Sequence, residues 1–532
     1  MLRIALVFAF ALPAFAQEKP AVTFQAKSPA ALLSHIREVG QIVGGKEAVD
    51  EFEKNLKDFV GEEGLQGLNI TQPILGYARL DGKPEETSFV LVVPITNEKD
   101  FLALLERIDA KVEEVKDDKG AYMLGGEQFE IPTYFRMTAT HAFIALNGTP
   151  KTVAAKSLIP VRDLHDESET GLFALHLHPG RADKNYAALA TKALDKIAAD
   201  ENLGDTETKW IKGLKPMAEM LLAQTERITF RGDIDPSTKM ASLDFQLVPK
   251  PNSLLALGFA ARKPSTNRFA GAADADGMAN TVLLSAPAWS KEIREALAAS
   301  FTDLGNFTKV IFAQGPAANV QPSIGKIIEG MAAAAKDGSL DFVSITTTPD
   351  KDGRIANVIA LKVNNPAEVD KELRILAQSV ADDNAELAKK INMEAAKHAG
   401  TAIHTFDLGE YLDKPMRDLL GADAKLAVAC GKHAVYIGLG TTAVDTVKLL
   451  LDAKPGEAAP VDVAIRPKGF AQSYRSMGLM EGIEKAFGTS DKPLRVAALT
   501  ATTTAKELHL RAELSLAFIR FAMMVQNAPA PP

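Results

Sequence analysis

The feature that most constrains this chain is that its strand and helix signals occur twice, in the same order. A buried apolar strand is predicted at 88–95 and another at 355–363, and an asparagine follows each, Asn97 or Asn365. Each asparagine has a carboxylate three residues further on, which is the signature of a helix N-terminus. The apolar residues that follow at helical spacing are Phe101, Leu104, Leu105 and Ile108 in the first half, and Val369, Leu373, Leu376 and Val380 in the second. The two asparagines are 268 residues apart, and the strands keep the same offset.

Further pairs of segments repeat in this order. They are 24–29 and 282–287, each leading into a helix; 140–148 and 432–440, each a strand and turn with a helix expected after it; 175–179 and 463–467, each a strand ending in proline; and 227–248 and 494–516, each two strands joined by a polar turn. The matches predict an internal duplication, with generic α+β patterning as the alternative. The offset falls back after the proline-terminated strands, which predicts an insertion at about 200–226 in the first copy.

The repeated pattern predicts the fold class. Turns of two to six residues between neighbouring strands require antiparallel pairing, and the helices between hairpins must cover a sheet face. We therefore expect an α+β fold of two tandem duplicated modules, each an antiparallel sheet built from hairpins with helices layered on one face. The polar, small-residue stretch 270–277 is predicted as a linker. The expected modules are 17–269 and 278–525, and 526–532 is expected to be a disordered Pro/Ala tail.

The first 16 residues predict the cellular location of the protein. Residues 1–16 combine an early arginine, an apolar run and small residues at the cleavage positions, which is typical of a cleaved signal peptide, with an N-terminal anchor helix as the alternative. We expect the mature chain to be exported, to a periplasm or the extracellular medium. No later apolar run approaches the ~20 residues of a membrane span.

Charge and cysteine content narrow the classes of partner. The net charge of −8 argues against nucleic acid and anionic membranes, which require a basic face. Cys430 is the only cysteine, so the chain forms no intramolecular disulfide. In its apolar context it is expected to be a buried hydrophobe, with a thiol nucleophile beside His433 as the alternative.

Two other motifs have a chemical interpretation. The glycines of Gly438-Leu-Gly440 follow a strand and precede a helix, as in a dinucleotide site, but the first copy lacks this spacing at 146–150. We interpret them as a glycine turn. His176 and His178 lie on one strand face with His165 upstream, a start for a zinc site that lacks an identifiable third ligand.

The short matches are discounted. The second copy has Ala464 and Arg466 in place of the two histidines, which are read as exposed strand-end residues. The tripeptide at 231–233 is a frequent chance match. The glycosylation sequons at 69–71, 147–149 and 306–308 have meaning only in a eukaryotic secretory pathway, whereas the signal and the alanine-rich composition favour a bacterial protein. We therefore predict no catalytic, cofactor-binding or metal-binding residue.

The export signal, proline-terminated strands and capped helices resemble large uncharacterised exported α+β proteins of bacteria. The resemblance covers most of the chain, has no diagnostic motif and implies no activity. The expected function is non-catalytic binding of a partner protein or an apolar small molecule, through sheet or inter-domain surfaces. The alternative is a hydrolase whose acid–base carboxylates are not recognisable in the sequence.

Overall fold

The structure is a computed structural model. It describes residues 19–80, 87–116, 118–125, 131–182, 222–260, 266–272, 277–285, 341–475, 479–504 and 506–526, with a few further residues between 192 and 337. The predicted signal peptide at 1–16, most of the predicted insertion at 200–226, part of the linker at 270–277 and nearly all of the tail lie outside the described residues.

The chain divides into two compact units. Unit 1 comprises 1–204, 211–262 and 502–511, and unit 2 comprises 205–210, 263–501 and 512–532. The return of 502–511 to unit 1 was not predicted. It brings the first half of β22 (Leu508–Ser515) beside β10 (Met240–Pro249).

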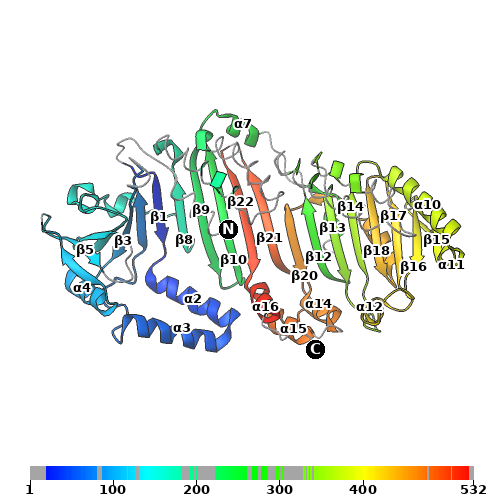
Figure 1. The fold of residues 1–532 in the computed structure, drawn as a ribbon, viewed down its shortest axis with the longest axis horizontal. Coiled ribbons are helices and arrows are strands. Elements are labelled where there is room, and N and C mark those ends of the chain that lie inside the picture. The colour runs from blue at the N-terminus through cyan, green and yellow to red at the C-terminus, as the bar shows by residue number, and fades with distance from the viewer. Residues whose placement is uncertain are drawn as a thin grey trace. The chain divides into compact units, whose positions relative to one another are not determined.

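Unit 1 contains an antiparallel sheet. In spatial order its strands are β4 (Lys111–Glu114), β5 (Ala121–Gly125), β6 (Thr133–Met137), β7 (His141–Leu146), β3 (Phe89–Pro94), β2 (Ile74–Ala78), β1 (Val22–Ala26), β8 (Phe173–Leu177), β9 (Thr225–Asp235) and β10. Its helices are α2 (Pro29–Val43), α3 (Gly45–Val60), α4 (Glu98–Arg107) and α7 (Leu254–Ala260) (Figure 1).

Unit 2 also contains an antiparallel sheet. In spatial order its strands are β15 (Ile391–His398), β16 (Thr401–Asp407), β17 (Lys425–Cys430), β18 (Ala434–Gly440), β14 (Asn357–Lys362), β13 (Asp341–Thr347), β12 (Met278–Ser285) and β20 (Val461–Ile465), followed by β21 (Leu494–Thr503). Its helices are α10 (Pro366–Asp383), α11 (Ala385–Ala388), α12 (Lys414–Leu420), α13 (Ala443–Leu451), α14 (Pro467–Ser473), α15 (Met480–Phe487) and α16 (Leu516–Gln526). A separate small sheet pairs β11 (Thr266–Asn267) with β19 (Gly456–Glu457).

The two sheets have the same strand order. Counted along the chain within each unit, the spatial order is fourth, fifth, sixth, seventh, third, second, first, eighth and ninth. The third strand leads in both units into a helix with an asparagine cap. Asn97 Oδ1 accepts the Asp100 N–H at 2.9 Å and Asn365 Oδ1 accepts the Glu368 N–H at 3.4 Å, which confirms both predicted caps.

Helices cover both faces of the sheet in unit 2, whereas one face was predicted. Val428 of β17 lies against α10, while its neighbours Ala427 and Ala429 pack in the core cluster that contains Val447 of α13. Adjacent strand residues point to opposite faces, so the two helices lie on opposite sides. The prediction was wrong because the central strands β17, β18 and β14 are apolar on both faces, and each face must be buried.

One predicted helix is also replaced. After β7 the chain forms 3-10 turns at Pro150–Val153, Ala155–Ser157 and Val161–Asp163 rather than a helix. Pro160 lacks the N–H that a continuous helix would need, so the segment breaks into short turns. Ile159 and Leu164 of this segment nevertheless cover the sheet, as α13 does in unit 2.

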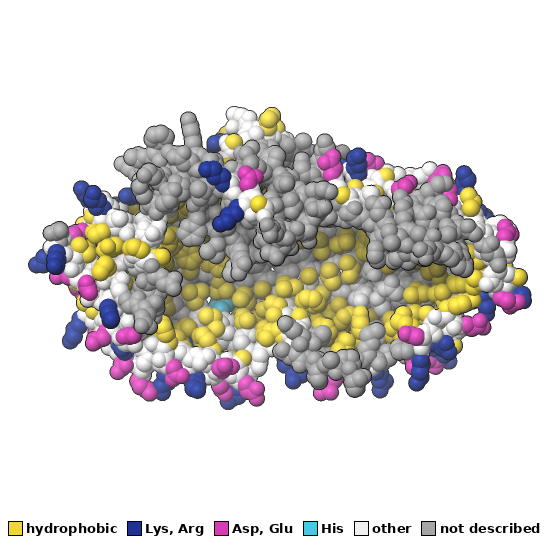
Figure 2. Space-filling model, in the orientation of Figure 1, with side chains coloured by type: hydrophobic (Ala, Val, Ile, Leu, Met, Phe, Trp, Pro, Cys, Tyr) yellow, Lys and Arg dark blue, Asp and Glu magenta, His cyan; other side chains and the backbone are white. Residues whose placement is uncertain are grey.

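Apolar side chains lie over the strands on the face of the molecule drawn in Figure 2. Figure 2 shows that side chains visible over the strands are largely hydrophobic, and that charged side chains gather around their borders. Within the described residues, none of the helices combines the length and apolar character that a bilayer crossing requires.

Candidate functional site

The candidate site is an apolar pocket in unit 2, between α10 and the sheet. Helix α10 presents the stripe Leu373, Leu376, Ala377 and Val380 to the strands. The chain then turns at Asn384, whose Oδ1 accepts the backbone N–H groups of Glu386 and Leu387 at 3.0 and 3.1 Å. This cap starts the short helix α11, which places Leu387 at the end of the stripe.

The pocket has a volume of about 320 Å³. Its walls are the helix residues named above together with Ile391, Met393, His404, Thr405, Phe406, Leu426 and Val428 of β15, β16 and β17. Among the lining side chains only those of His404 and Thr405 are polar. A concave apolar space with few polar groups is the usual form of a small-molecule site.

The pocket is present because Val428, the strand residue beneath α10, is small. The corresponding place in unit 1 is found from the strand ladders. Leu91 and Ile359 each lie six residues before the asparagine cap, and they pair with Ile144 and Ile437 on the next strand. Those residues pair in turn with Phe135 in unit 1 and with Val428 in unit 2.

In unit 1 the aromatic ring at this place fills the space. Phe135 is fully buried and stacks on Tyr122 at a centroid distance of 5.0 Å. Phe101 of α4 meets the same ring edge-on at 6.1 Å. The equivalents of Phe135 and Phe101 in unit 2 are Val428 and Val369, so the two rings that meet beneath α4 have no counterparts at these positions.

A polar network borders the pocket through His404. His404 is buried, and its Nδ1 accepts the Glu394 N–H at 3.0 Å, so Nε2 carries the proton that is donated to Asp370 Oδ1 at 2.8 Å. Arg374 donates to Asp370 Oδ2 at 2.8 Å and to Glu394 Oε1 at 2.9 Å. Both ring nitrogens of His404 are therefore satisfied by the protein itself.

Backbone geometry and charge stabilise this network. Glu394 has a φ of 60° within an irregularity of the β15–β16 pairing, and this turns its N–H toward His404. Burial acts to raise the pKa of Asp370, but hydrogen bonds from Arg374 and His404 outweigh it and hold that pKa below its ordinary value. The carboxylate therefore stays ionised beside the pocket.

Cys430 follows the pocket-lining residue Val428 by two positions on β17, and its thiol is unreactive. It packs against the buried cluster of Leu361, Val363, Val369 and Val435. Burial, together with the Asp370 charge, raises the pKa of its thiol to about 12. His433, the proposed base, is exposed. A protonated, half-buried thiol is a poor nucleophile, which favours the interpretation of Cys430 as a packing residue.

The glycines of Gly438-Leu-Gly440 have a packing role. A Cβ on Gly438 would lie 2.8 Å from the Ala443 carbonyl oxygen, so this glycine lets α13 approach the strand. Gly440 has a φ of 126°, and a Cβ on it would lie 2.6 Å from the Ile355 carbonyl oxygen. Close approach of backbone to backbone explains both residues.

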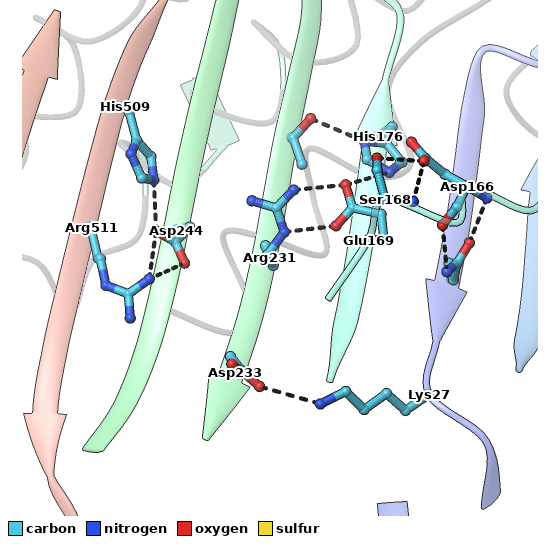
Figure 3. Close-up of polar contacts among 12 residues, drawn as sticks. Lys27, Asp166, Ser168, Glu169, His176, Arg231, Asp233, Asp244, His509 and Arg511 are labelled. Atoms are coloured by element: carbon cyan, nitrogen blue, oxygen red, sulfur yellow. Dashed lines mark hydrogen bonds and ion pairs between the residues drawn. The ribbon is translucent and has the colours of Figure 1, made fainter. Parts of the chain in front are cut away.

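Of the histidines considered for zinc, His176 lies within a polar cluster on the sheet of unit 1 (Figure 3). His176 is buried rather than exposed, and its Nδ1 lies 3.0 Å from Thr229 Oγ1. Its Nε2 is 3.6 Å from Glu169, whose carboxylate is held by Arg231 through two contacts of 2.7 Å. Among the residues that the structure describes, no group of three or more His, Cys, Asp or Glu side chains is placed to hold a metal ion.

Other charged residues of this cluster form ion pairs. Asp233 Oδ1 lies 3.9 Å from Lys27 Nζ, so both charged residues of the tripeptide at 231–233 contact other parts of unit 1. Asp244 of β10 is buried and pairs with His509 at 2.6 Å and Arg511 at 3.1 Å (Figure 3). These contacts tie segment 502–511 to unit 1.

The sequence located part of the pocket and missed the rest. It predicted that Leu373, Leu376 and Val380 share a helix face, and the structure confirms this. The network of His404 with Asp370 joins residues 34 positions apart. No spacing rule signals such a pair, because the strand pairing alone brings them together.

Comparison with known proteins gives little more. No family model and no curated protein matches this chain. Among solved structures, crystal forms III and IV of TP0453 are similar to part of it, each with a TM-score of 0.23, 11% identity and 46% of this chain covered. The matches cover 80% of the TP0453 chain in form III and 83% in form IV. A TM-score this low supports no argument about fold or function.

Proposed function

We propose that this protein is a non-catalytic binding protein that takes an uncharged apolar ligand, such as an alkyl chain, into the α10 pocket. The observation that carries the proposal is a cavity of about 320 Å³ with ten apolar residues among the twelve that line it. The other two lining residues are His404 and Thr405, and both ring nitrogens of His404 already form hydrogen bonds within the protein. A ligand would gain from burial of apolar surface rather than from polar recognition.

The charges near the pocket favour a neutral ligand. Asp370 and Glu394 contribute two carboxylates against the single guanidinium of Arg374. An anionic head group would be repelled there, and a cationic one would compete with Arg374. The proposal therefore commits to an uncharged chain.

Two further proposals concern the origin of the two units and the cellular location of the protein. We propose that the two units arose by duplication of one module, and their common strand order and paired asparagine caps support this. We propose export to a periplasm or the extracellular medium on the strength of the signal in residues 1–16.

Binding of a homologous series of primary alcohols tests the ligand proposal. Each buried methylene contributes roughly 0.8 kcal/mol, so affinity should rise about fourfold per added carbon until the pocket is full. Calorimetry or displacement of a fluorescent apolar probe gives the affinities.

A pair of variants on the pocket supplies the control. Val428→Phe places in unit 2 the ring that fills unit 1, and we expect it to weaken binding by at least about tenfold. Ile375→Phe adds the same ring to α10 at a position that is 49% exposed, and it should leave binding unchanged. Affinity that does not depend on chain length, or equal losses in both variants, would refute an apolar pocket ligand. Native mass spectrometry showing only a complex with another protein would favour a protein partner instead.

A further inference from the structure

Unit 1 contains a second pocket, of different chemistry, at one end of β8, β9 and β10. It has a volume of about 410 Å³. Its lining consists of His178, Gly180, Arg181, Glu226, Arg227, Val248 and Lys250. Three cationic side chains thus meet one carboxylate in a concave space, although the chain as a whole has a net charge of −8.

The cations come from three separate elements. Arg181 ends the 3-10 turn Pro179–Arg181, Arg227 lies on β9, and Lys250 follows β10. The Lys250 side chain runs along the turn, since a Cβ on Gly180 would lie 3.9 Å from Lys250 Cε. Strand pairing therefore holds the three charges together.

Several donors in this pocket are unused. Nε of Arg227 is buried and has no hydrogen-bond partner among the described residues. Arg181 donates through Nη1 to the Pro20 carbonyl at 2.9 Å, and Lys250 Nζ donates to the Ala223 carbonyl at 2.7 Å. A guanidinium has five N–H donors and an ammonium has three, so each side chain keeps donors for a ligand.

Burial and neighbouring charges both act on the titratable groups of this pocket. Burial, with the positive charges of Arg181, His176, Arg227 and Lys19, lowers the pKa of His178 to about 4. Burial also lowers the pKa of Arg181, against the opposing effect of Glu226. Desolvated cations with one carboxylate between them would be stabilised by a bound anion.

We propose that this pocket binds a phosphate group, with Arg227, Arg181 and Lys250 as its ligands. The lining side chains carry a net charge of +2 with His178 neutral, which complements a phosphate that is close to doubly charged at neutral pH. Guanidinium groups also match phosphate oxygens geometrically. The group is either a free or soluble phosphate or the head group of a phospholipid, and the two sources share this chemistry.

Titration of the full chain with inorganic phosphate at constant ionic strength tests the site. We expect saturable binding near neutral pH, measured by NMR from the signals of the His178 imidazole. The pKa of His178 should be higher in the phosphate-bound protein than in the free protein. Arg227→Gln should weaken binding by about tenfold or more, since a charge-assisted contact is lost. Arg162→Gln removes the same charge from a side chain that is 87% exposed, and it should have no effect.

A second arm identifies the source of the phosphate. Cosedimentation with phosphatidate vesicles, compared with phosphatidylcholine vesicles, should depend on Arg227 if the ligand is a lipid head group. Binding of inorganic phosphate without vesicle binding identifies a soluble ligand. Arg227→Lys keeps the charge but not the forked donors, and it should bind with intermediate affinity, which separates loss of the site from misfolding. Absence of binding in both arms, or equal weakening by Arg227→Gln and Arg162→Gln, would overturn the proposal.

Discussion

The same place in the two units is packed in two different ways. Beneath α4, Phe135 lies between Tyr122 and Phe101 within a cluster of buried apolar side chains. Beneath α10, Val428 takes the position of Phe135 and a cavity of about 320 Å³ remains. A shared strand order therefore fixes where a helix lies on the sheet, while the size of a few side chains decides whether the interface is a solid core or a pocket.

The polar residue that pairs with this position on the neighbouring strand also differs between the two units. On the strand next to Phe135, Tyr122 donates to Glu98 of α4 at 2.9 Å. On the strand next to Val428, His404 donates to Asp370 of α10 at 2.8 Å. Both units link strand to helix through a carboxylate, but only in unit 2 does this link border a cavity.

The largest expected effect comes from emptying the filled site. Phe135→Ala should destabilise unit 1 by ~3–5 kcal/mol, because a fully buried ring is replaced by a void. Val428→Ala should cost only about 1–2 kcal/mol, since it removes two methyl groups beside an existing cavity. Denaturant unfolding, with hydrogen exchange on β6 and β17 to assign each loss to its unit, measures the difference. Equal losses at the two sites would contradict the contrast.

The polar link should have the next largest effect. Asp370→Asn should reduce the stability of unit 2 by ~1–3 kcal/mol, because charge-assisted hydrogen bonds to Arg374 and His404 are weakened.

The pH dependence gives this prediction its sign. The folded-state pKa of Asp370 is lowered, so its contribution is present above the ordinary aspartate pKa and is lost as pH falls through the folded value. Asp370→Asn should remove that part of the acid dependence, whereas Asp382→Asn, an exposed carboxylate on the same helix, should not. An unchanged acid profile in Asp370→Asn would show that the link contributes nothing.

The smallest expected effect comes from filling the open site. Val428→Phe should stabilise the ligand-free protein by about 1 kcal/mol, since the ring would bury apolar surface in an empty space. A thermal unfolding scan in the absence of ligand measures it. A loss of stability would mean that the pocket cannot accept a ring without strain, and that the two sites are less alike than their ladders indicate.

The sequence predicted local structure well where the signal lies within a few residues. The caps at Asn97 and Asn365, the strand at 355–363 and the stripe on α10 are all found in the structure. It was wrong about the helix after β7, which proline breaks into 3-10 turns, and about helices on a single face. It also took His176 as exposed, because burial of a strand end depends on what packs over it.

What the sequence by itself determined is the order and type of the elements, since periodicity, caps and turn residues act over one or two turns of chain. Tertiary structure alone decided the two sites. The α10 pocket requires the positions of β15, β16 and β17 under one helix, and the basic pocket requires a turn and two strands to bring Arg181, Arg227 and Lys250 together. Cavities and charge clusters are properties of the space between segments, and that space is set only when distant strands pair.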